Sequence, residues 1–206
     1  MSDRAIRCTL LGVGAMRSPR YRPAGLLVSY SGRRIMLDGG PESAPDRDVE
    51  AWLVTDESAE LAAPIRRLAA QRGLKPLAAD YRLGDLLVER RGVAHTSHPT
   101  YGYLLRAHGH RVVWAPEFWE FPEWADGADL MFADAAGWRR PIRFRGGVGG
   151  HACVLDIADE ARRRRVERLV FAHIGRPSIR AQDSGQNPPY GIWGEEGRTY
   201  LVARDG

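Results

Sequence analysis

Residues 53–61 read Leu-Val-Thr-Asp-Glu-Ser-Ala-Glu-Leu, and they join an apolar strand to a helix through acidic and small residues. Residues 51–54 are typical of a short buried strand, and residues 59–71 carry apolar side chains at helical spacing. The acidic residues between them have two interpretations that the sequence leaves open. Asp56 and Glu60 either bind a metal ion or only complement the positive end of the helix dipole.

Strands are expected to recur along the rest of the chain, with few helices between them. The expected strands cover residues 4–12, 25–30, 33–37, 85–89, 102–106, 111–114, 130–132, 169–172 and 199–203. A second helix is expected over residues 154–166, whereas residues 146–150 and 182–189 read as loops. This order of elements indicates an α/β protein with mixed rather than wholly parallel sheets.

Composition places the chain among ordinary globular proteins. Its 206 residues suit one domain, and a hydrophobic content of 44% with 27% charged residues is unexceptional. No apolar run reaches the length of a membrane span and Met-Ser-Asp-Arg opens no signal peptide, so we expect a cytoplasmic protein without a membrane partner. Cys8 and Cys153 form no metal-binding or disulfide pattern and are expected to be buried.

Nearly all of the positive charge is carried by arginine, because Lys75 is the only lysine in a chain of net charge +4. Codon bias in a GC-rich genome explains this composition most simply. The functional interpretation is bidentate recognition of phosphate, which arginine performs better than lysine. Clustering of arginines would favour the second interpretation.

Two familiar enzyme classes find no support in the sequence. Gly12-x-Gly14 follows a strand, but Arg17 stands where a dinucleotide-binding loop needs its third glycine. The next segment contains Pro19 and Pro23 instead of a helix that could bind a pyrophosphate. No Gly-x-Ser-x-Gly motif is present, which argues against a serine hydrolase of the α/β type.

Short motifs recur in a fixed order along most of the chain. They are Leu-Leu-Gly-Val-Gly at 10–14, Thr-Tyr-Gly-Tyr-Leu-Leu at 100–105, Arg-Val-Val-Trp-Ala-Pro-Glu at 111–117, Gly-His-Ala-Cys at 150–153 and Leu-Val-Phe-Ala-His-Ile at 169–174. In order and spacing they resemble the metallo-β-lactamase superfamily, nearest its phosphodiesterase and tRNA 3′-processing branches. The resemblance implies an αββα sandwich of two mixed β-sheets flanked by helices, in a single domain covering residues 1–206.

The same resemblance implies an altered metal site. In that superfamily the strand matching residues 51–54 runs into Thr-His-x-His-x-Asp-His, and the ligand positions here hold Asp56, Ser58, Glu60 and Leu61. Serine is a poor ligand and leucine cannot bind a metal, so a full two-ion centre is not expected. The implied ligands for one divalent ion (zinc, manganese or iron) are Asp56, Glu60, His95, Glu117 and His173.

One ligand assignment stays open at this stage. The interval from His95 to Gly102 is a residue longer than the family pattern, so His98 competes with His95, which we prefer. His151 resembles a histidine that assists catalysis in the phosphodiesterase and RNA-processing branches, as an acid or by stabilising developing charge.

The resemblance leads to two functional hypotheses. The first is a hydrolase with a single-ion site that acts on a phosphodiester or similar anionic ester, either a small substrate or a nucleic acid. The second is a non-catalytic descendant without a metal, which binds a ligand or a partner. Arginines near the expected rim are the candidates for substrate binding, namely Arg20, Arg22, Arg140 and Arg176. A homodimer is the default expectation for a cytoplasmic protein.

Overall fold

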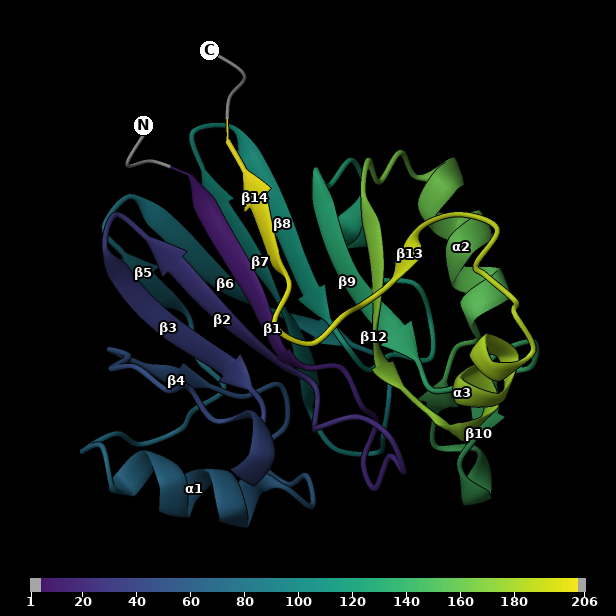
Figure 1. Ribbon diagram of the computed structural model, residues 1–206, viewed down its shortest axis with the longest axis horizontal. Helices are drawn as coiled ribbons and strands as arrows, with labels where there is room; N and C mark the ends of the chain where they lie inside the picture. The colour runs from purple at the N-terminus through teal and green to yellow at the C-terminus, as the bar shows by residue number, and fades with distance from the viewer. Residues whose placement is uncertain (1–4, 204–206) are drawn as a thin grey trace.

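The computed structural model describes residues 5–203 and contains two large β-sheets that pack face to face, with helices on their outer sides (Figure 1). The first sheet has the strand order β14-β1-β2-β3-β4. Its members are β1 (Ile6–Gly12), β2 (Gly25–Tyr30), β3 (Arg33–Asp38), β4 (Trp52–Leu53) and β14 (Thr199–Val202). Pairing in this sheet is antiparallel except between β3 and β4.

The second sheet has the order β13-β12-β9-β8-β7-β6-β5. Its members are β5 (Tyr81–Leu83), β6 (Leu86–Val93), β7 (Thr100–Ala107), β8 (His110–Ala115), β9 (Leu130–Ala135), β12 (Leu169–Ile174) and β13 (Ile192–Trp193). β8, β9, β12 and β13 run parallel, and the remaining pairs are antiparallel. Every residue of β9 and β12 is buried, as expected for parallel strands covered on both faces.

A continuous apolar core fills the space between the sheets. It includes Trp114, Tyr103, Phe132 and Phe171, which are among the largest fully buried side chains. Because side chains alternate along a strand, residues 6, 8 and 10 of β1 face this core. A smaller cluster joins the first sheet to α1 (Ala62–Ala70), through Leu27 and Met36 on the sheet and Ile65 on the helix.

The other helices, α2 (Val154–Arg163) and α3 (Arg176–Asp183), lie beside the second sheet (Figure 1). Three 3-10 turns, η1 (Pro41–Ser43), η2 (Glu123–Ala125) and η3 (Arg145–Gly147), and a small ribbon of β10 (Ile142–Arg143) and β11 (Gly150–His151) complete the described chain. Within that part of the chain, no helix is long and apolar enough to cross a membrane.

The expected α/β class and the sandwich of two mixed sheets are confirmed. The strand expected over residues 25–30 is observed with those bounds. The first helix begins only at Ala62, because residues 57–61 form turns. The sequence analysis did not predict α3, β5, β10, β11 or β13, which are short. Cys8 and Cys153 are buried and free, as expected.

Candidate functional site

A pocket of about 700 Å³ lies where several strands of the two sheets end. Asp38 closes β3, His173 lies near the end of β12, and residues 54–61 follow β4. Further lining residues follow β6, β8 and β9, and His151 comes from β11. The carboxyl ends of strands are where α/β proteins commonly place functional groups. His173 and Asp38 also have positive φ angles of 56° and 52°, a strained conformation for residues other than glycine.

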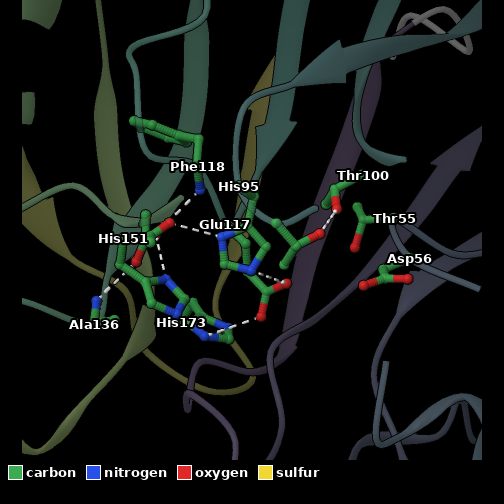
Figure 2. Close-up of polar contacts among 12 residues, drawn as sticks. Thr55, Asp56, His95, Thr100, Glu117, Phe118, Ala136, His151 and His173 are labelled. Carbon is green, nitrogen blue, oxygen red and sulfur yellow. Dashed lines mark hydrogen bonds and ion pairs between the residues drawn. The ribbon is translucent and has the colours of Figure 1, made fainter. Parts of the chain in front are cut away.

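Glu117 lines this pocket and lies between two histidines (Figure 2). One carboxylate oxygen is 3.5 Å from Nε2 of His95, and the other is 3.1 Å from Nε2 of His173. All three residues were predicted as ligands of one ion, and the fold brings them together. The carboxylate itself, however, fills the gap between the two imidazoles.

The protonation of this trio follows from its surroundings. Nδ1 of His95 lies 2.8 Å from the carbonyl oxygen of Gly150, which can only accept, so Nδ1 carries a hydrogen. Burial lowers the pKa of His95, and burial lowers the pKa of His173 to about 4, so both rings are neutral at neutral pH. Burial raises the pKa of Glu117. Because the hydrogen of His95 is on Nδ1, its Nε2 can only accept a hydrogen bond. A protonated Glu117 is the donor that suits this position.

His151 forms a second unit beside this trio. Its Nδ1 donates to Oδ2 of Asp134 at 2.8 Å, and its ring stacks on that of His173 with centroids 5.3 Å apart. Burial alone would lower the pKa of His151, but the charge and hydrogen bond of Asp134 outweigh it and raise that pKa. Since Nδ1 is occupied, Nε2 is the ring nitrogen left for the pocket that His151 lines.

Asp134, which pairs with His151, was not predicted from the sequence. It is fully buried and accepts hydrogen bonds from the backbone N–H of Phe118 at 3.2 Å and of Ala136 at 2.8 Å (Figure 2). Burial would raise its pKa, but the facing His151 and these hydrogen bonds hold the pKa below the ordinary value. The available signal was a single carboxylate inside the apolar strand Leu-Met-Phe-Ala-Asp-Ala.

Asp56, the first predicted ligand, is engaged elsewhere. Its Oδ2 lies 2.7 Å from Nε2 of His98, and its Oδ1 accepts a hydrogen bond from the backbone N–H of Ser58 at 2.7 Å. Asp56 lines the same pocket as Glu117, and Figure 2 draws no contact between the two carboxylates. Of the two competing histidines, His95 faces Glu117, whereas His98 pairs with Asp56.

Glu60, the remaining predicted ligand, lies near the surface. Its carboxylate is 3.3 Å from the guanidinium of Arg17, and the two side chains are 56% and 81% exposed. Among residues 5–203, no group of three or more His, Cys, Asp or Glu side chains is arranged to hold a metal ion. Each of the five predicted ligands has another side chain as its partner in this arrangement.

The predicted substrate-binding arginines are dispersed. Arg176 lines the pocket, as does Arg17. Arg20 pairs with Asp183 at 2.6 Å, and Arg22 pairs with Glu196 at 3.0 Å. Arg140 is exposed and outside the pocket lining. Cations therefore reach the pocket mouth from two segments, the loop after β1 and the start of α3.

The apolar part of the pocket wall comes from different segments. Met16 and Ile142 are both large exposed hydrophobic residues at this mouth, with 44% and 37% of their surface accessible. Phe144 also lines the pocket and contacts the rings of His95 and His151 edge-on, with centroids 5.2 and 5.4 Å apart. The pocket thus combines an apolar wall with a compact cluster of titratable groups.

Gly149 permits the close approach that positions His95 and His151. Its φ is 135°, and a Cβ there would lie 2.0 Å from the carbonyl oxygen of His95. We expect Gly149→Ala to lower the free energy of unfolding by at least about 2 kcal/mol, measured by urea denaturation. Gly147→Ala is the matched control, because Gly147 also has a positive φ but has open space around it. Equal effects of the two substitutions would contradict this packing role.

Comparisons with known proteins agree with this geometry at the level of fold. No protein-family model matches the chain, and no curated protein matches it in sequence. Among solved structures it is similar to the metallo-β-lactamase fold protein YhfI from Bacillus subtilis, with a TM-score of 0.76 and 13% identity over 97% of this chain and 100% of that one.

Other solved structures are similar over comparable lengths. A diphosphatase of the PhnP family matches with a TM-score of 0.70 and 16% identity, over 96% of this chain and 97% of that one. The Zn²⁺-bound PqqB of Methylobacterium extorquens matches with a TM-score of 0.68 and 16% identity, over 94% and 99%. These likenesses, together with the two mixed sheets and their flanking helices, establish that the chain has the metallo-β-lactamase fold.

Proposed function

We propose that this chain is a hydrolase that works without a resident metal ion and cleaves an anionic ester by acid–base catalysis. The observation that carries the proposal is the set of pairings at the site. Glu117 occupies the gap between His95 and His173, while Asp56 and Glu60 are held by His98 and Arg17. The remaining groups, the His151–Asp134 pair and Glu117 with its two histidines, are arranged so that they can transfer protons.

His151 is the proposed general base. Asp134 holds its Nδ1 at 2.8 Å, which fixes the tautomer in which Nε2 can accept a proton. In the proposed reaction, Nε2 takes a proton from a water molecule whose oxygen bonds to the phosphorus or acyl carbon of the ester. A base oriented in this way contributes about 10²–10⁴-fold to a rate.

Glu117 is the proposed general acid. Its raised pKa lets it hold a proton, which it gives to the ester oxygen as the bond to that oxygen breaks. His151 and Glu117 would then exchange a proton through solvent to restore the starting state. His151 acts as the base only in its neutral form, and Glu117 acts as the acid only in its protonated form.

The substrate class is inferred from the pocket mouth. Arg176 supplies a cation for a negatively charged group, and Met16, Ile142 and Phe144 supply an apolar surface for the remainder of the molecule. A phosphodiester with an apolar or aromatic substituent meets both requirements. A structurally similar protein of the PhnP family is a diphosphatase, which supports the choice of a phosphate ester as the proposed substrate.

A second candidate is the single-ion hydrolase. It is favoured by one observation, the convergence of two neutral imidazoles and a carboxylate at His95, His173 and Glu117. Zinc, manganese or iron(II) would suit these donors and would supply an activated water. Binding would require the Glu117 carboxylate to leave the space between the rings, and the Zn²⁺ of PqqB belongs to a protein that shares only the fold.

Hydrolysis of bis(para-nitrophenyl) phosphate, before and after treatment with a chelator, separates the candidates. We expect turnover that the chelator leaves unchanged within about twofold, because no step passes through an ion. Loss of turnover on chelation and recovery with zinc, manganese or iron(II) would support the second candidate instead. Saturable binding of the ester without turnover would overturn both and leave a binding protein on a hydrolase fold.

A further inference from the structure

A second groove, of about 800 Å³, lies on the outer face of the first sheet. It shares no lining residue with the pocket that holds His151. Its floor is formed by β1, β2 and β3, and one wall by the loop after η1, which contributes Arg47. α1 packs over a different part of this face, where Leu27 and Met36 join its apolar cluster. No part of the proposed reaction involves this groove.

Strand register places polar donors side by side on the floor of the groove. Arg7 on β1 is paired with Ser29 on β2, which is in turn paired with Arg34 on β3. Directly paired residues share a face of the sheet, and adjacent strands lie about 4.8 Å apart. The backbones of Arg7 and Arg34 are therefore about 10 Å apart, a span that two arginine side chains can close around one anion.

Three of the four arginines that line the groove have no carboxylate partner. The fourth, Arg22, pairs with Glu196 at 3.0 Å, and Arg33 beside the groove pairs with Glu50 at 2.5 Å. Among the described residues Arg7, Arg34 and Arg47 make no such pair, and Asp46 is the only carboxylate that lines the groove.

A buried hydroxyl adds an observation that does not depend on charge. Ser43 lines the groove with 1% of its surface exposed, and its Oγ has no hydrogen-bond partner among the described residues. A buried polar atom without a partner is uncommon in folded proteins. This hydroxyl belongs to a residue in the wall of the groove.

We propose that this groove is a separate binding site for a phosphate-bearing anion, held between Arg7 and Arg34 with Arg47 and Ser29 beside it. Guanidinium groups bind phosphate oxygens in a bidentate manner, and the row of paired residues presents such groups from both sides. The phosphate group could belong to a small molecule or to a nucleic-acid backbone, and both present the same oxygens.

Isothermal titration calorimetry with pyrophosphate, and separately with a single-stranded oligonucleotide, tests the site in the full-length protein. We expect binding of pyrophosphate that weakens at least about tenfold in Arg7→Gln and in Arg34→Gln. Arg162→Gln is the matched control, since that exposed arginine pairs with Asp159 on α2, and it should bind like the wild type. His151→Asn should also bind normally, because His151 lies in the other pocket.

Comparing the two probes also shows whether the bound phosphate belongs to a small molecule or to a nucleic acid. Much tighter binding of the oligonucleotide, with a steep dependence on salt, would indicate a nucleic-acid backbone. Binding of pyrophosphate alone would indicate a small phosphorylated ligand. The proposal is overturned if neither probe binds the folded wild type, or if binding survives in both arginine variants.

Discussion

Replacing His151 with asparagine is expected to lower the turnover of an ester substrate by about 10²–10⁴-fold, the usual contribution of a positioned general base. Asparagine is chosen because its amide N–H can still donate to Asp134, so the buried carboxylate keeps a partner. The measurement is kcat/KM for bis(para-nitrophenyl) phosphate, with the thermal midpoint recorded alongside to show that the variant is folded.

His108 provides a matched control for this substitution, because it lies outside the pocket. His108 stacks on Tyr30 and bonds its hydroxyl at 2.8 Å, so His108→Asn changes a histidine that lies outside the pocket. Its turnover should equal that of the wild type. If His151→Asn were folded and as active as His108→Asn, His151 would not be the base.

The pH profile gives a second test of the same residue. A base must be unprotonated to act, so kcat/KM should fall as the pH drops through the raised pKa of His151. Asp134→Asn removes the charge that raises this pKa, and the acid limb should therefore move to lower pH. An acid limb that stays in place in Asp134→Asn would show that another group titrates.

The largest effect on stability is expected from Asp134→Ala, which should lower the free energy of unfolding by about 3–5 kcal/mol. The substitution leaves the backbone N–H groups of Phe118 and Ala136 without their acceptor and leaves His151 without its partner, all in a buried environment. Urea denaturation at neutral pH measures the change.

Asp129→Ala provides the comparison for that prediction. Asp129 also accepts a backbone hydrogen bond, from Arg111 at 2.6 Å, but its side chain is 29% exposed, so water can replace it. We expect a loss of no more than about 1.5 kcal/mol there. Similar decreases in the free energy of unfolding for Asp134→Ala and Asp129→Ala would show that the burial of Asp134 does not increase its contribution to stability.

The sequence predicted the fold well because fold depends on features that are visible locally. Alternating and continuous apolar runs located most strands, and the order of the short motifs indicated the sandwich. The helix α3 was missed because Arg-Pro-Ser-Ile-Arg-Ala-Gln-Asp is short and strongly polar, so that its apolar face consists of little more than Ile179 and Ala181.

The site was harder to predict, since it depends on which side chains meet. His95, Glu117 and His173 were predicted to converge, and they do. The position of Glu60 could not be read from spacing, because the turns over residues 57–61 direct it toward Arg17 at the surface. Asp134 was overlooked because all the remaining residues of its strand are apolar. Only the tertiary structure brings His151 next to it.

The site proposed for this chain works without a metal, whereas the structure of PqqB holds Zn²⁺. A metal site needs donors that face a shared empty point, whereas here Glu117 and the imidazoles face one another directly. These pairings form a buried network of imidazoles and carboxyls in which protons can be held at defined atoms.

Elemental metal analysis tests this central claim most directly. The protein is purified without a metal-binding tag, incubated with zinc, manganese or iron(II), and freed of loosely bound ions before measurement. The account predicts well below one ion per chain under each condition, with no difference between the wild type and His173→Ala. About one ion per chain, lost in both His173→Ala and Glu117→Ala, would contradict it and establish the single-ion site.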